Sequence, residues 1–500
     1  MVTRQNPFEI VSGADRLTKP GTILVMFFFA VISAWVITHL EVIGALVLFL
    51  LPAVLTFLYF LFRYPIIGIY TAIAFGFILL GLARYAPIPM LGIALDVEII
   101  LTFIALFINK FKEKIDFSPA NRDVTWISVI WSCYFIFEFI NPEVVNKGAW
   151  FAGRGVALYM LVLVPLTLIF IDSNRKLDAF FLIWGIFSVL VTCKGLMQHF
   201  YGVDYAERQW LNEGNAATHI LFGKLRVFSF LSDAGQFGAN QGYSAVVAVI
   251  ISLVQKDRKM KIFFIAVALL GFYGLVISGT RGALSVPFAG FTAFFVLKKN
   301  KVALISGFIV IALFYIFFKY TFIAQGNSEI RRMRSAFDPN NPSLQVRLAN
   351  QKKLKSYLAS RPFGGGVGHA GGKARKFAPR AFLSNVPADS WYVLIWAEQG
   401  IVGLALHLII LFYIVGKASY NVMFRIRDPI VKTKMSALIA GMFGIMAASY
   451  GNMVLGQMPT SVLIYMSMAI MLSSDVFDSE ALQENTNINE LHTNYEFRNI

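Results

Sequence analysis

Residues 302–318 read VALISGFIVIALFYIFF, a run of seventeen residues without a charged side chain. A helix of this length rises about 25 Å, close to the ~30 Å hydrocarbon core of a bilayer. Its apolar residues cover every face of the helix, whereas a helix of a soluble domain keeps a polar face. Residues 23–40, ILVMFFFAVISAWVITHL, have the same character. Both segments are therefore predicted to cross a lipid bilayer.

The composition of the whole chain agrees with these two segments. Of its 500 residues, 57% are hydrophobic and only 14% are charged, a balance that a soluble chain of this length could not keep folded in water. Hydropathy predicts about fourteen transmembrane helices, at residues 22–40, 43–62, 65–83, 88–109, 124–140, 155–171, 178–197, 240–255, 262–278, 283–297, 302–318, 388–415, 434–450 and 455–472. The chain is predicted to be an all-α polytopic membrane protein.

The basic residues of the short connections predict the orientation of the helices. Every second connection is basic, with Lys110, Lys112, Lys114 and Arg122, then Arg175 and Lys176, then Lys256, Arg258, Lys259 and Lys261, then Lys298, Lys299 and Lys301, and finally the segment from Lys417 to Lys434. Cytoplasmic connections carry an excess of Lys and Arg, so both termini are predicted to be cytoplasmic. We expect the polar tail from Asp475 to Ile500 to be disordered.

Two long segments are predicted to lie outside the cytoplasm. The chain divides into N-terminal transmembrane helices (1–197), a first extracytoplasmic loop (198–239), further transmembrane helices (240–318), a large extracytoplasmic loop between the eleventh and twelfth helices (319–387), C-terminal transmembrane helices (388–472) and a cytoplasmic tail (473–500). The large loop holds thirteen basic and two acidic residues, a net charge of +11. Such a charge suggests an anionic partner. Asn341-Pro342 predicts a surface helix there that ends before Arg361-Pro362.

Arg281 is the first candidate for chemistry. It lies in a very short predicted turn, SGTRG at residues 278–282, at the boundary of the membrane. Its guanidinium is permanently charged and can bind phosphate oxygens through two parallel hydrogen bonds. The alternative is an arginine that anchors the helix end at the lipid headgroups.

Arg347 and a glycine run lie in the large loop. Arg347 is on the predicted surface helix, and RPFGGGVGH follows at residues 361–369. Glycines let backbone N–H groups approach a phosphate, but the run lacks the Gly-Lys-Ser/Thr ending of a P-loop. A turn that closes the helix is the alternative. His369 is a candidate base, or a solvated loop histidine.

Asp389 lies in PADSWYVLIWAEQGIVG, residues 387–403, where the basic loop enters a membrane helix. A carboxylate at this boundary, beside arginines, is a candidate general base. The alternative is an N-cap, followed by Trp391 and Tyr392 as interfacial aromatic residues.

The remaining polar residues give weaker signals. Asp96 and Glu98 lie in an apolar helix, where ionisable groups serve a substrate, an ion or an internal pair. No His, Cys and Asp cluster has the spacing of metal ligands, so we predict neither a metal nor another cofactor.

On these residues the chain resembles the O-antigen ligase and O-antigen polymerase superfamily of bacterial envelope glycan assembly. The resemblance covers roughly residues 190–420 and rests on the turn with Arg281, the large loop before a late helix, Arg347 followed by Pro362 and by Gly366 to Gly368, the block from Asp389 to Gly403, and Arg226-Val227-Phe228-Ser229 with the run from Gly235 to Gly242. One position departs from the ligases, which typically have His-Asn where this chain has Asp389-Ser390. Asp389, Glu398, Gly400 and Gly403 are similar to the related shape-and-division peptidoglycan polymerases.

The resemblance implies a metal-independent, inverting glycosyltransferase of polysaccharide or lipopolysaccharide biosynthesis in the cell envelope. Its donor would be a glycan linked to undecaprenyl pyrophosphate, its acceptor a hydroxyl of a glycan or glycolipid, and its site would face outward from the bacterial inner membrane. Membrane lipids, and no nucleic acid, would be its other partners. Asp389 would act as the base while Arg281 and Arg347 stabilise the departing pyrophosphate. The expected substrate contacts are Arg226, Arg361, Gly366, Gly368, His369 and Trp391.

A transporter or flippase of an anionic lipid-linked glycan is the competing class. It would also need many helices and an arginine-lined path, but it would not need a large basic loop on one face. The residues do not decide between a ligase and a polymerase.

Overall fold

The computed structural model describes residues 20–85, 91–112, 115–221, 223–299, 301–326, 328–335, 338, 340–371 and 374–498. Lys114, one of the basic residues named above, lies outside the described residues, as do residues 1–19 of the N-terminal part and residues 372 and 373 of the large loop.

Helices make up most of the described chain. They are α2 (Pro20–Arg63), α3 (Ile66–Tyr85), α4 (Ala94–Lys112), α5 (Asp123–Phe137), α6 (Lys147–Ala152), α7 (Leu158–Phe170), α8 (Asn174–Tyr201), α9 (Tyr205–Trp210), α10 (Ala216–His219), α11 (Ala234–Ser252), α12 (Arg258–Ile277), α13 (Ser285–Leu297), α14 (Lys301–Tyr320), α15 (Ser328–Arg334), α16 (Pro342–Leu358), α17 (Ala374–Phe377), α18 (Phe382–Asn385), α19 (Trp391–Phe424), α20 (Pro429–Ala448), α21 (Thr460–Leu472) and α22 (Ser474–Arg498). Short 3-10 turns include η6 (Arg281–Leu284), and one hairpin pairs β1 (Ile220–Leu221) with β2 (Lys224–Leu225) in antiparallel fashion.

The all-α, polytopic membrane architecture is confirmed. Among the described residues, seven helices are long and apolar enough to cross a bilayer, and α21 with the first part of α22 forms one further bent pair. Four shorter apolar helices accompany them. Every predicted transmembrane segment overlaps a helix, and the first two both lie in α2, which bends at Glu41. The total of fourteen spans stays a prediction.

The core of the bundle is built on α11, α13, α20 and α21. All thirteen residues of α21 are buried, and α11 is buried over nearly its whole length. A Cβ added at Gly290 of α13 would lie 2.9 Å from the Ala440 carbonyl oxygen, and one at Gly444 of α20 would lie 2.6 Å from that of Val286. Small residues therefore let these two helices approach closely, as is common between membrane helices.

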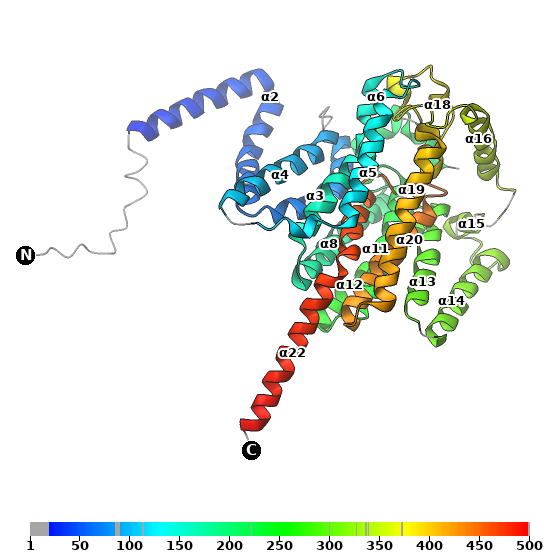
Figure 1. The fold of residues 1–500 in the computed structure, drawn as a ribbon. Coiled ribbons are helices and arrows are strands. Elements are labelled where there is room, and N and C mark those ends of the chain that lie inside the picture. The colour runs from blue at the N-terminus through cyan, green and yellow to red at the C-terminus, as the bar shows by residue number, and fades with distance from the viewer. Residues whose placement is uncertain are drawn as a thin grey trace, which may run out of the picture.

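The two ends of the bundle differ. α16, α18 and α6 lie at one end, and α22 projects from the other (Figure 1). The basic connections gather at the α22 end, where Lys299 Nζ donates to the Met423 carbonyl (2.9 Å) and Arg122 pairs with Asp475 (2.7 Å). The opposite end carries the described residues of the ranges 202–233, 278–284, 321–390 and 449–459, and we call it the loop end.

The expectation that the polar tail is disordered is wrong for its described residues, 475–498, because they lie in α22. Phe477 is fully buried, the Asn174 backbone N–H donates to Glu480 (2.6 Å), and the Arg427 backbone N–H donates to Asp478 (3.0 Å). One buried aromatic ring and two carboxylates in the first turns of α22 thus fasten the start of the tail to the bundle, which composition alone does not reveal.

Candidate functional site

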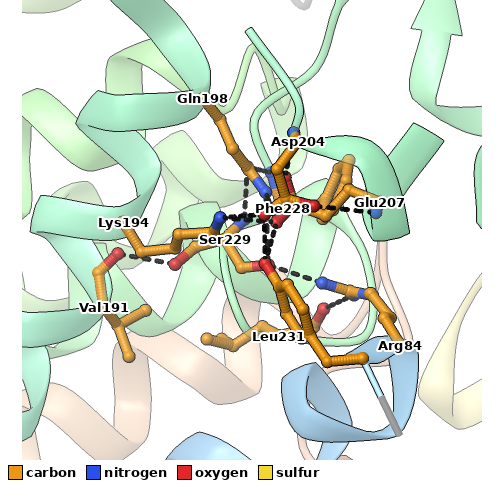
Figure 2. A network of polar contacts seen from close by, with 10 residues as sticks. Arg84, Val191, Lys194, Gln198, Asp204, Glu207, Phe228, Ser229 and Leu231 are labelled. Carbon is orange, nitrogen blue, oxygen red and sulfur yellow. Dashed lines mark hydrogen bonds and ion pairs between the residues drawn. The ribbon is translucent and has the colours of Figure 1, made fainter. Parts of the chain in front are cut away.

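A buried polar network fixes the first loop to α3 and α8 at the loop end (Figure 2). Glu207 is fully buried, pairs with Lys194 (3.1 Å) and accepts a hydrogen bond from Gln198 Nε2 (2.7 Å). Gln198 Oε1 in turn accepts the backbone N–H of Ser229 (2.7 Å), and Arg84 Nη1 donates to the Ser229 carbonyl (2.6 Å). The backbone just after Arg226 is therefore held in one position.

Arg226 connects this loop to the turn that carries Arg281. Its Nη2 donates to Thr280 Oγ1 (2.9 Å) and its Nη1 to the Thr218 carbonyl (3.1 Å). Burial, and then the nearby charge of Arg332, lower the pKa of Arg226 to about 10. The guanidinium is still charged at neutral pH, so the positive charges of Arg226 and Arg332 lie close together although they repel each other.

Arg281 and Arg332 lie together at the same turn. Arg281 Nη1 donates to Ser335 Oγ (3.0 Å), just beyond α15. Gly279 adopts a φ of +58°, and a Cβ added there would lie 3.5 Å from Arg332 Cδ, so α15 covers the turn closely. Burial and the charge of Arg281 lower the pKa of Arg332. Arg226, Arg281 and Arg332 thus form an arginine cluster, which is suited to an anion.

Arg347 and Asp389 form an ion pair beside this cluster. Arg347 Nε lies 3.8 Å from Asp389 Oδ2, with the side chains 37% and 44% exposed. A Cβ added at Gly451 would lie 3.5 Å from Arg347 Nη1 and 3.9 Å from the Gly282 Cα. Arg347 therefore lies close to both the carboxylate of Asp389 and the turn of Arg281.

The ion pair lines a pocket between α16, the start of α19 and the connection that follows α20. Its lining residues are Leu344, Arg347, Leu348, Asn350, Gln351, Pro387, Asp389, Ser390, Val393, Tyr450 and Gly451. The helix around Arg347 begins at Pro342, as predicted from Asn341-Pro342.

Asp389 does not cap α19, so the capping alternative is wrong. The N-cap is Ser390, whose side chain accepts the Val393 backbone N–H (3.5 Å) and donates to the Ser449 carbonyl (3.1 Å). The Trp391 backbone N–H also donates to Ser449 (3.0 Å). These contacts fix the start of the helix, and the Asp389 carboxylate faces the pocket instead.

The glycine run joins the large loop to α19 through backbone hydrogen bonds. The helix breaks at Gly400, which has a φ of +66°. Gly365 N donates to the Ala397 carbonyl (2.9 Å) and Gly366 N to that of Glu398 (3.0 Å). A Cβ added at Gly368 would clash with the backbone of Ala149. Gly366 and Gly368 are therefore enclosed by other parts of the chain, at Val144 and Ala149, and do not line the pocket.

His369, Arg361 and Trp391 are also not among the residues that line the pocket of Asp389. His369 is 1% exposed, and its Nε2 accepts the backbone N–H of Asn146 (3.2 Å). Arg361 Nε lies 2.9 Å from a Glu143 carboxylate oxygen. The buried indole of Trp391 donates to His407 Nε2 (2.9 Å). Each of the three thus has a partner within the fold.

The two acidic residues of α4 have internal partners. Arg154 Nε donates to Asp96 Oδ2 (2.9 Å), and Thr102 Oγ1 donates to Glu98 (3.0 Å). In the part of the chain that the structure describes, no group of three or more His, Cys, Asp or Glu residues could hold a metal ion.

The sequence analysis did not name every residue at this site. Arg332 is one of several arginines in a basic segment, and nothing in the sequence distinguishes it from its neighbours. Tyr450 and Gly451 come from a connection about sixty residues beyond Asp389. Their spacing from Asp389 carries no signal.

Comparison with known families bears on this geometry. Residues 265–408 match a family model described as O-Antigen ligase. The match contains Arg281, Arg347 and Asp389, and it confirms the resemblance to the O-antigen ligase and O-antigen polymerase superfamily. A search of curated proteins finds no match. The match supports a membrane glycan ligase or polymerase in general, and the apolar helices suggest a multi-pass membrane protein.

Proposed function

We propose that this protein transfers or polymerises glycan from an undecaprenyl-pyrophosphate-linked donor onto an acceptor hydroxyl. The observation that carries the proposal is the Asp389 carboxylate 3.8 Å from Arg347, beside the arginine cluster. A general base next to an anion site is the arrangement that glycosyl transfer from a pyrophosphate requires.

The arginines would bind the pyrophosphate of the donor. Arg226, Arg281 and Arg332 come from three different segments of the loop end, and Arg347 adds a fourth guanidinium on the side of Asp389. Each can offer paired N–H groups to phosphate oxygens. Because the cluster lies where apolar helices end, a polyprenyl chain could remain in the lipid while its headgroup is bound.

The transfer itself would be one displacement. Asp389 takes the proton of the acceptor hydroxyl as its oxygen attacks the anomeric carbon. The bond from that carbon to the pyrophosphate oxygen breaks, and its electron pair leaves with the pyrophosphate, where Arg281 and Arg347 stabilise the growing charge. Attack opposite the leaving group inverts the anomeric centre. The guanidinium groups supply the positive charge, so the proposed mechanism uses no metal.

The other expected substrate contacts receive different roles. We assign Arg226 to the donor, because it is hydrogen-bonded to the turn of Arg281. Arg361, His369 and Trp391 would act indirectly, through the contacts that hold the large loop and α19 in place. Gly366 and Gly368 would also hold the large loop in place, because they allow the glycine run to pack closely against the rest of the chain.

The site is proposed to face outward from the inner membrane. The gathering of basic connections at the α22 end supports a cytoplasmic position for that end. The loop end would then lie at the outer surface of the membrane.

The test is transfer by purified protein in proteoliposomes, with lipid-linked glycan extracted from membranes of the host as donor. Wild type should form the transferred product, and Asp389→Asn should fold and form none. Asp338→Asn, a change at an exposed acid of the same loop, should remain active. Movement of donor across the bilayer without any product would contradict the proposal and support the transporter.

A further inference from the structure

The pocket of Asp389 contains polar side chains that the proposed mechanism does not use. Asn350 and Gln351 follow Arg347 by three and four residues on α16, so the three side chains share one face of the helix. Tyr450 lies on the other wall and is 66% exposed. Within the described residues, the side chains of Asn350, Gln351 and Tyr450 make no hydrogen bond to another protein group. Their polar atoms are therefore available to a ligand.

We infer that this pocket is the acceptor subsite, and that a sugar ring lies in it against Tyr450 with its hydroxyls on Asn350 and Gln351. The inference rests on the proposed function, because it needs Asp389 to be the base of a transfer reaction. It adds the chemical class of the acceptor and the residues that select it.

Arg347 lies close both to Asp389 and to the turn of Arg281. A displacement requires the attacking hydroxyl to approach opposite the leaving group. An acceptor hydroxyl in contact with Asp389 must therefore enter the pocket that Asp389 lines together with Asn350, Gln351 and Tyr450.

The lining chemistry fits a neutral ring better than an anion. Apart from the pair of Arg347 and Asp389, every residue that lines the pocket is uncharged. Side-chain amides both donate and accept, as sugar hydroxyls do. The ring of Tyr450 offers an apolar face with a polar tip, which suits the C–H face of a pyranose.

An exposed tyrosine at the end of a membrane helix could instead be an interfacial anchor. An anchor would act on membrane insertion or thermal stability, and it would leave the dependence of the rate on acceptor concentration unchanged. The two roles therefore differ in a measurable quantity.

The experiment measures initial transfer rates while the donor and the acceptor glycan, both purified from membranes of the host, are varied separately. Tyr450→Ala should raise the acceptor KM roughly tenfold, and Gln351→Ala roughly three- to tenfold, as expected for one lost hydrogen bond. The donor KM should stay within about twofold. Tyr450→Phe keeps the ring face and should stay within about threefold of wild type.

The controls are Tyr201→Ala, another exposed tyrosine at the loop end, and Lys353→Ala on the exposed face of α16. Gln351→Ala places a strong helix former on a helix surface, so it should fold even if Tyr450→Ala does not. Unchanged acceptor KM in the folded variants, or an equal rise in donor KM, would overturn the inference while wild-type transfer leaves the proposed function standing. Absence of transfer by wild type would remove both.

Discussion

The substitution Arg347→Lys distinguishes two roles of Arg347: stabilisation of the leaving group in catalysis, or only an ion pair with Asp389 in the resting protein. Arg347 and Asp389 are 3.8 Å apart and 37% and 44% exposed, so their pairing in the resting protein contributes about 1 kcal/mol or less. Loss of that pairing alone would lower activity by about fivefold at most. Loss of a guanidinium that stabilises the departing pyrophosphate costs roughly 3 kcal/mol, or about 10²-fold in kcat. Lysine keeps the charge but removes the paired N–H groups.

The assay is the proteoliposome transfer reaction, with kcat and donor KM measured separately. We expect kcat to fall by about 10²-fold in Arg347→Lys, since the lost contact forms fully only in the transition state. Arg380→Lys, at an exposed arginine of the same loop, should match wild type. A decrease of fivefold or less in both kcat and kcat/KM for the donor would refute the assignment of Arg347 to the leaving group.

Three further outcomes test the architecture. With both native cysteines replaced, a cysteine at Lys353 should react with an impermeant thiol reagent in spheroplasts, whereas one at Lys256 should not; the reverse pattern would invert the proposed orientation. Lys194→Met leaves a fully buried carboxylate without its cation and should lower the free energy of unfolding by about 3 kcal/mol, which would appear as a lower Tm in detergent; an unchanged Tm would exclude a supporting role for the network. Gly400→Ala should destabilise the protein, because a Cβ there would clash with backbone at a φ of +66°, whereas Gly416→Ala on the same helix has open space around it and should be neutral.

Much of the fold follows from local chemistry. Apolar runs of bilayer length must be helical, because lipid offers no partner for backbone N–H and C=O groups. For that reason hydropathy located the long apolar helices, whereas it did not locate the polar helix α22. The predicted start of α11 is six residues too late. Asp233 is the N-cap and accepts the Gln236 backbone N–H, and the polar first turns that follow are buried against other helices, so hydropathy does not detect them.

The site was only partly predictable. Arg281, Arg347 and Asp389 stand out because charges at membrane boundaries are costly and tend to be functional. Arg332 did not stand out, because its position depends on how α15 docks over Gly279, which is a tertiary contact. His369 reads as a solvated loop residue, yet the folding of the glycine run onto α19 buries it. The spacing of residues in the sequence predicts neither the docking of α15 nor the burial of His369.

The two walls of the site are held in place to different degrees. Asp389 adjoins Ser390 and Trp391, which are hydrogen-bonded to Ser449, and the network around Glu207 holds the segment of Arg226. The segment that carries Arg347 has weaker support. Leu354 and Leu358 of α16 are buried, but Leu344, Val346 and Leu348 around Arg347 are exposed.

The positive charges of Arg226, Arg281, Arg332 and Arg347 repel one another, and that repulsion acts most on the wall whose apolar side chains are exposed. A pyrophosphate would replace the repulsion with attraction, so binding of the proposed donor would stabilise the segment of α16 that carries Arg347.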